Sequence, residues 1–160
     1  MIRTFFDHFG FSRSKPLLAA ALMAVFIGPF QALADLSDWK HSGLVYIVTT
    51  PAGANLPASA LEKNFPLLVR LHREFFDFSQ AKPRGEDIRF TAKGKLLAHQ
   101  IERWDAAEGH AEIWVRIPVI KGNDQQGIRM HWGNARAAGA SNGERVFRTT
   151  EGFAGVWHLE

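Results

Sequence analysis

The sequence predicts an all-β protein, an antiparallel, jelly-roll-like β-sandwich preceded by a signal peptide. After residue 34, no segment keeps the helical period of apolar residues. Short runs of alternating apolar and polar residues recur instead, and Gly, Pro or Asn separates them. Short connections pair neighbouring strands antiparallel, and a sheet with one apolar face needs a second layer. Two packed sheets are therefore expected.

Residues 1–34 have the three parts of a secretory signal peptide. Basic residues up to Lys15 precede an apolar run at 17–27, and a Gly-Pro break follows before the small residues that end at Ala34. The alternatives are an uncleaved anchor and a helix of the mature fold, but a bilayer-spanning helix needs roughly 20 apolar residues. We expect cleavage after Ala34, which places the mature protein in the periplasm or at the cell surface. Membrane association would then come only through regions absent from this sequence.

The charge and the cysteine content exclude several classes of function. The formal net charge is +3, from 19 Lys and Arg and 16 Asp and Glu. The first 34 residues hold three of the basic residues and one of the acidic ones, so the mature chain is nearly neutral. Without a basic run it is not expected to bind nucleic acid. The chain contains no cysteine, which excludes disulfides, thiolate metal sites and a cysteine nucleophile.

Two strands are expected in the first half of the mature chain. Residues 44–50 are rich in β-branched and aromatic side chains, and a loop with two prolines follows at 51–57. Residues 59–63 are expected to form at most one helical turn. Residues 65–72 alternate partly, so their odd-numbered leucines and valine are expected to face the core. Three rings then follow, which we expect to plug the end of the core: Phe75, Phe76 and Phe78.

The stretch 85–118 predicts three further strands joined by two tight turns. The first alternates around Ile88 and Phe90, and the second covers residues 96–104 as one strand. The third, at 111–117, shows the clearest alternation, and Pro118 is expected to end or edge its ladder. A sixth strand is expected at 128–132. The core residues expected from this stretch are Ile88, Phe90, Ile113, Val115 and Ile117.

The composition also predicts how the chain is divided. Residues 35–133 are expected to form the β-sandwich domain. The small and polar residues at 134–146 predict a linker. Residues 147–160 predict the start of a truncated following β domain.

Seven sequence blocks of the mature chain follow one another in a recognisable order. They are Trp39-Lys40, PLLVRLH (66–72), FDFSQA (76–81), GEDIRF (85–90), IERWD (101–105), AEIWVRIP (111–118) and IRMHWGN (128–134). Together they resemble the bacterial domain-of-unknown-function family 2341, although His131 and Trp132 stand where two tyrosines are expected. The resemblance implies a cell-envelope setting and no enzyme activity. It also implies a following lectin-like domain of concanavalin or laminin-G type, begun by GVWHLE (155–160), and in some relatives a proton channel of the MotA/TolQ/ExbB type.

Polar and aromatic residues that alternate with the core positions are expected to share the opposite face of the sheet. They are Arg70, Arg89, Glu102, Trp104, Glu112, Trp114, Arg116, Arg129 and His131. The candidate ligand-binding residues among them are Arg89, Glu102, Trp104, Glu112, Trp114 and Arg116. Trp rings can stack on the C–H groups of sugars, and Arg and Glu can bond hydroxyls. The alternative is cross-strand ion pairing on a solvated face, with the Trp rings covering a neighbouring domain.

Catalytic and metal sites receive little support from the sequence. Glycoside hydrolysis needs two carboxylates across the scissile bond, and the candidates are Asp87, Glu102, Asp105, Glu108 and Glu112. Their spacing does not single out a pair. The mature histidines, at positions 41, 72, 99, 110, 131 and 158, show no zinc-ligand spacing. No catalytic residue, metal or cofactor is expected.

The sequence therefore predicts a noncatalytic exported module that binds or positions a glycan or protein at the cell envelope. The alternative is the extracytoplasmic structural domain of a proton-driven MotA/TolQ/ExbB-like biopolymer transport protein. A glycoside hydrolase accessory or catalytic domain is the third hypothesis.

Overall fold

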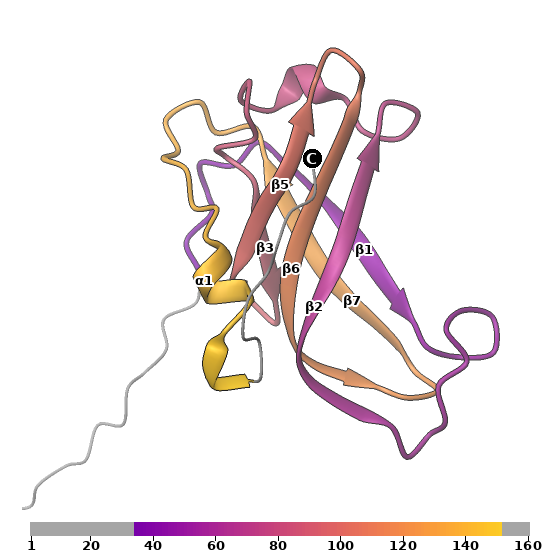
Figure 1. Ribbon diagram of the computed structural model, residues 1–160. Helices are drawn as coiled ribbons and strands as arrows, with labels where there is room; N and C mark the ends of the chain where they lie inside the picture. The colour runs from indigo at the N-terminus through magenta and orange to yellow at the C-terminus, as the bar shows by residue number, and fades with distance from the viewer. Residues whose placement is uncertain (1–33, 152–160) are drawn as a thin grey trace, which may run out of the picture. The chain divides into compact units, whose positions relative to one another are not determined.

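The computed structural model describes residues 34–151, and they form two antiparallel sheets (Figure 1). The four-stranded sheet has the order β1 (His41–Val48), β7 (Gln125–Trp132), β3 (Arg89–Ala92), β4 (Lys95–Leu97). The three-stranded sheet has the order β2 (Leu61–His72), β6 (His110–Lys121), β5 (His99–Asp105). The helices are short: η1 (Phe78–Gln80), α1 (Gly143–Val146) and η2 (Thr149–Glu151). The predicted all-β sandwich is confirmed.

The core lies between the two sheets, because apolar side chains at alternate positions of β6 point into the space between them. Ile113 and Val115 are fully buried, and Ile117 is nearly so. Ile88 and Phe90 reach the same apolar cluster from the other sheet and are also fully buried. The five predicted core residues are therefore confirmed. Each such side chain stabilises the fold by about 1.5–3 kcal/mol relative to an exposed one.

The single strand expected at 96–104 is wrong, because the chain changes sheets within it. β4 ends at Leu97 in the four-stranded sheet, and β5 begins at His99 in the three-stranded sheet. Leu97 is paired with Phe90 and His99 with Val115, so both face the core. Only Ala98 lies between them, and its carbonyl accepts a hydrogen bond of 2.9 Å from the Arg116 amide. The apolar alternation continues through the change of sheet, which is why the sequence pattern did not reveal it.

Two further expectations about strand ends are corrected. Pro118 does not end its strand, since β6 continues to Lys121. It does lie at an edge of the ladder, because the pairing with β5 stops at Val115 and, among the described strands, only β2 pairs with β6 beyond it. Opposite Pro118, Asn64 takes a positive φ of 57°, and the pairing register passes over both residues. This irregularity accommodates the missing amide of Pro118 inside the ladder. The strand expected to start at residue 65 begins earlier, because β2 already starts at Leu61.

The segment expected to be a linker packs on the sandwich. Asn134 and Ala137 are buried, and Val146 of α1 is fully buried. The division into domains at these positions stays a prediction. The expected signal peptide covers residues 1–34, of which only Ala34 is described. The expected following domain covers residues 147–160, of which only 147–151 are described. In the described part of the chain, no helix has the length and apolar character to cross a membrane.

Candidate functional site

Asp87 is a fully buried carboxylate that joins two of the sequence blocks. Its Oδ1 accepts a hydrogen bond of 2.8 Å from the amide of Lys82. Its Oδ2 accepts bonds of 2.7 and 3.1 Å from the amides of Gly133 and Asn134. Three donors satisfy a charge that would otherwise be costly to bury. Asp87 therefore fastens the loop before β3 to the end of β7, which is a structural role.

Arg89 is the predicted site residue that lies on the four-stranded sheet, whereas the other five candidates lie on the three-stranded sheet. It belongs to β3, and its guanidinium carbon lies 5.4 Å from the centre of the Trp39 ring. Its Nη1 donates to the carbonyl of Glu86 at 3.0 Å and its Nη2 to that of Ala138 at 2.6 Å. Arg89 thus holds two loops together, apart from the other five candidates.

Glu102, Glu112, Trp114 and Arg116 do lie together, on the outer face of the three-stranded sheet. Trp114 Nε1 donates a hydrogen bond of 2.6 Å to Glu102 Oε2. Glu112 Oε1 lies 3.1 Å from Arg70 Nε and 3.5 Å from His110 Nε2. The hydrogen bond from Arg70 lowers the pKa of Glu112 despite an opposing contribution from burial. This part of the face is a paired, partly solvated charge network, which is the alternative that the sequence left open.

Trp104 turns into the molecule instead of joining that face. The pairing of β5 with β6 runs from Ile101–Ile113 to Arg103–Glu112, so Glu102 is an extra residue in a bulge. The bulge shifts the alternation by one, and Trp104 then stands opposite the buried Ala111. Its ring packs against Phe78 at 5.2 Å and against Phe76 at 6.1 Å between centroids. The expectation that Trp104 shares the outer face is wrong for this reason.

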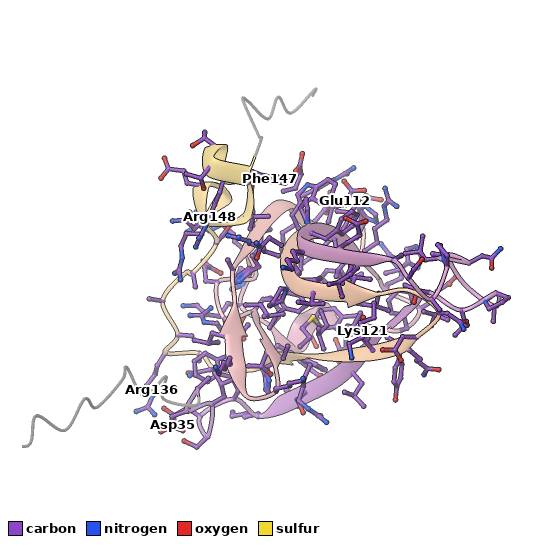
Figure 2. All side chains as sticks on the ribbon, turned by 90° about the horizontal axis from the view of Figure 1, so that it is seen from below. Asp35, Glu112, Lys121, Arg136, Phe147 and Arg148 are labelled. Atoms are coloured by element: carbon purple, nitrogen blue, oxygen red, sulfur yellow. The ribbon has the colours of Figure 1, made fainter. Side chains whose placement is uncertain are left out.

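Residues 142–148 cover one end of the same outer face, and we call this segment the docked segment. The amide of Asn142 donates to the carbonyl of His99 at 2.8 Å, and its side chain caps α1 through the amide of Arg145 at 2.9 Å. Val146 is fully buried, and the ring of Phe147 meets Trp114 edge-on at 5.5 Å. Figure 2 shows Phe147, Arg148 and Glu112 on the same side of the sandwich.

Arg116 is buried beneath this docked segment. Only 9% of the residue is exposed, and Nη1 donates to the carbonyl of Arg145 at 3.4 Å. Trp114 and Arg116, two of the candidates for ligand binding, are therefore in contact with the chain itself. The sequence offered one signal for this arrangement, the adjacent apolar Val146 and Phe147 after a small and polar stretch.

An open groove of about 580 Å³ is lined by residues of the loop after β2, of η1 and of the β5–β6 turn. We call it the end groove. One wall is the loop 73–79 and the other is the turn 106–109. Phe76 and Phe78 are buried, as the predicted plug requires, but Phe75 is 69% exposed and does not belong to it. This groove was not predicted from the sequence. The signal was the pair Phe75-Phe76, because adjacent side chains rarely enter the same core together.

The model of a family described as domain of unknown function (DUF2341) matches residues 84–160. Residues 84–160 are therefore similar to this family. The match confirms the resemblance, and the blocks from GEDIRF to IRMHWGN lie within it, while the three earlier blocks precede it. No curated protein and no solved structure matches the chain.

The DUF2341 blocks meet one another in space. The GEDIRF and IRMHWGN blocks are fastened through Asp87 to Gly133 and Asn134. The IERWD and AEIWVRIP blocks pair with each other as β5 and β6. The backbone also constrains Gly85, whose φ is +69° and where a Cβ would stand 2.7 Å from Trp104 Cε3. These contacts link the matched blocks to one another in the fold.

Asp105, another acidic candidate, is held in local contacts as well. Asp105 Oδ1 accepts a hydrogen bond of 2.8 Å from the amide of Glu108, which lowers the pKa of Asp105, and Arg103 contributes in the same direction. A general acid would need a raised pKa. Within residues 34–151, no three or more His, Asp or Glu side chains are grouped so that they could hold a metal ion.

Proposed function

We propose that this protein is a noncatalytic exported β-sandwich module that binds and positions a polypeptide at the cell envelope. The observation that carries the proposal is the docked segment on the outer face of the three-stranded sheet. The face holds it through the buried Val146 and through the contact of Phe147 with Trp114. The module would thereby fix the direction in which the chain continues beyond Arg148.

The geometry favours a polypeptide over a glycan on this face. A sugar platform needs accessible aromatic faces, but Phe147 packs on Trp114 and Trp104 is turned inward. Arg89 lies on the other sheet. The six residues therefore do not form one surface on which a sugar could stack. A face already occupied by a short helix and a phenylalanine suits an apolar chain segment better.

The noncatalytic part of the proposal rests on the acidic residues. Glu112 and Asp105 lie beside Arg70 and Arg103, and both carboxyl groups have a lowered pKa. Asp87 is buried and accepts three backbone amides. The lowered pKa values of Glu112 and Asp105 favour their ionised forms, whereas glycoside hydrolysis needs one protonated partner.

The alternative role in a proton-driven transport protein would use the same docked segment to orient a membrane domain. The two proposals differ in what the gene encodes after the sandwich. Membrane-spanning helices encoded downstream would favour transport, and a further lectin-like domain alone would favour the positioning of a surface module.

Hydrogen exchange of the exported chain tests the positioning role. We expect the amides of the docked segment to be protected in the wild type, and Phe147→Ala to raise their exchange rates at least tenfold, since that corresponds to about 1.4 kcal/mol of lost local stability. Phe75→Ala, an aromatic truncation at the end groove, is the matched control and should leave these amides unchanged. Equal exchange in the wild type and Phe147→Ala would contradict the proposal.

Export is tested separately by the mass of the protein recovered from a bacterial host. We expect a periplasmic or secreted product that begins at Asp35, because the predicted cleavage follows Ala34. Recovery of the uncleaved chain from the cytoplasm would contradict this part of the proposal and leave the docking result unaffected.

A further inference from the structure

We propose that the end groove binds a ligand of its own, a neutral oligosaccharide. Phe75 would supply the ring on which a sugar stacks, and Asp77 and Glu74 would accept hydrogen bonds from its hydroxyls. The groove lies at the loop end of the sandwich and shares no residue with the docked segment. The inference therefore goes beyond the positioning role.

Phe75 is the aromatic platform of the groove. Its neighbours Phe76 and Phe78 are buried and pack edge to face at 4.9 Å, whereas 69% of Phe75 stays exposed. The amides of both Phe75 and Phe76 donate to the carbonyl of His72, at 3.1 and 3.0 Å, so the backbone under the ring is fixed. A preorganised, exposed aromatic ring loses little conformational freedom when an apolar sugar face covers it.

The carboxylate of Asp77 is oriented for hydrogen bonding. Its Oδ1 accepts bonds from the Ser79 amide at 3.0 Å and from Ser79 Oγ at 2.6 Å. These bonds lower the pKa of Asp77 and keep it ionised. Within residues 34–151 its Oδ2 accepts no hydrogen bond, so it remains available to a hydroxyl group of a ligand. Glu74 adds a second carboxylate, with an 80% exposed side chain.

Arg73 builds the wall of the groove, and its donors are largely occupied. Nη2 donates to the carbonyl of Ala107 at 2.9 Å and Nε to that of Glu108 at 3.0 Å. These bonds tie the loop after β2 to the β5–β6 turn and make the two walls one rigid unit. The lining holds one arginine and two carboxylates, those of Glu74 and Asp77, so its net charge is −1. A negative net charge disfavours an anionic polymer.

The size of the groove suits a short stretch of a polysaccharide. Its volume of about 580 Å³ falls within the range of roughly 300–1,000 Å³ that is usual for ligand sites. Because the groove is open to solvent, it does not require the polymer to end inside it. Hydroxyl-rich, uncharged sugars match one aromatic face flanked by carboxylates.

Calorimetric titration of the exported chain with cellohexaose, chitohexaose and maltohexaose, and with anionic hexagalacturonate, tests the inference. We expect at least one of the three neutral sugars to bind and hexagalacturonate to bind at least tenfold more weakly. Phe75→Ala should weaken the binding at least tenfold, and Phe75→Tyr should preserve it. Leu96→Ala, which truncates an exposed apolar side chain on the four-stranded sheet, is the matched control and should not change it.

The outcomes separate this inference from the positioning role. No binding of any of the three neutral sugars, or equal binding by the wild type and Phe75→Ala, would overturn the oligosaccharide site. Tighter binding of hexagalacturonate than of the neutral sugars would overturn it as well. None of these results would alter the hydrogen exchange of the docked segment, so each proposal can fail alone.

Discussion

The sandwich should become less stable as the pH drops below neutral, because of His99. Its side chain is inside the core, where 2% of the residue is exposed and its ring centroid lies 5.8 Å from that of Phe90. Its Nε2 is buried and has no hydrogen-bond partner among the described residues. Burial lowers the pKa of His99 to about 4, and the positive charges of Arg89 and Arg145 act in the same direction. The folded protein therefore keeps this imidazole neutral.

The sign and size of the effect follow from the pKa difference. As the pH falls through the ordinary value of 6.5, the unfolded chain binds a proton that the folded chain does not, so the unfolded state is stabilised relative to the folded state. The loss continues until the pH reaches the folded pKa of about 4. At about 1.4 kcal/mol per pKa unit, the full loss is about 3 kcal/mol, of which about 2 kcal/mol falls between about pH 7 and pH 5.

Urea unfolding at these two pH values, for the wild type and for His99→Leu, measures the effect. Leucine has a similar volume and no titration, so the loss of unfolding free energy between the two pH values should be smaller in the variant by about 2 kcal/mol. His131, whose pKa burial also lowers, is present in both proteins and cancels in the difference. If both proteins lose the same free energy, His99 is not neutral and buried as described, and the reasoning fails.

Two further substitutions test the contacts of the DUF2341 blocks. Asp87→Ala should lower the free energy of unfolding in urea by about 3 kcal/mol or more, since it leaves buried amides without acceptors. Asp38 lies in an exposed ion pair, so Asp38→Ala should lower that free energy by less than about 1 kcal/mol. Equal losses in the two variants would refute the role of the buried carboxylate. Gly85→Ala should lower the melting temperature, because its φ is +69° and the new Cβ would meet Trp104, while Gly139→Ala, whose Cβ would stand 3.9 Å from its nearest neighbour, should do so far less. A melting temperature unchanged in Gly85→Ala would show that the loop adapts.

The sequence predicted the core of β6 well because alternation directly reports which face a strand residue occupies. Ile113, Val115 and Ile117 are buried as expected. The prediction failed for Trp104, where the bulge at Glu102 inserts one residue. A signal was present, since two charged residues separate Ile101 from Trp104 and break the period of two. Local patterns predict faces, but a bulge is decided by pairing with the partner strand.

The candidate site was predictable only in part, for a related reason. Glu102, Glu112 and Trp114 belong to two strands that are neighbours along the chain and in the sheet. Arg89 belongs to a strand of similar pattern, but the change of sheet after Leu97 places it on the opposite layer. The docking of Phe147 on Trp114 joins residues that are far apart in sequence, and no local period reports such a contact.

The change of sheet at Ala98 has a consequence for how the protein folds. Since one residue separates β4 from β5, neither sheet can complete its hydrogen bonds until the other has taken its place around that corner. The two layers should not behave as separate foldons, and slow-exchanging amides in both should open together with the free energy of global unfolding. A single cooperative transition, seen alike by Trp fluorescence and by circular dichroism, is the behaviour that this corner imposes.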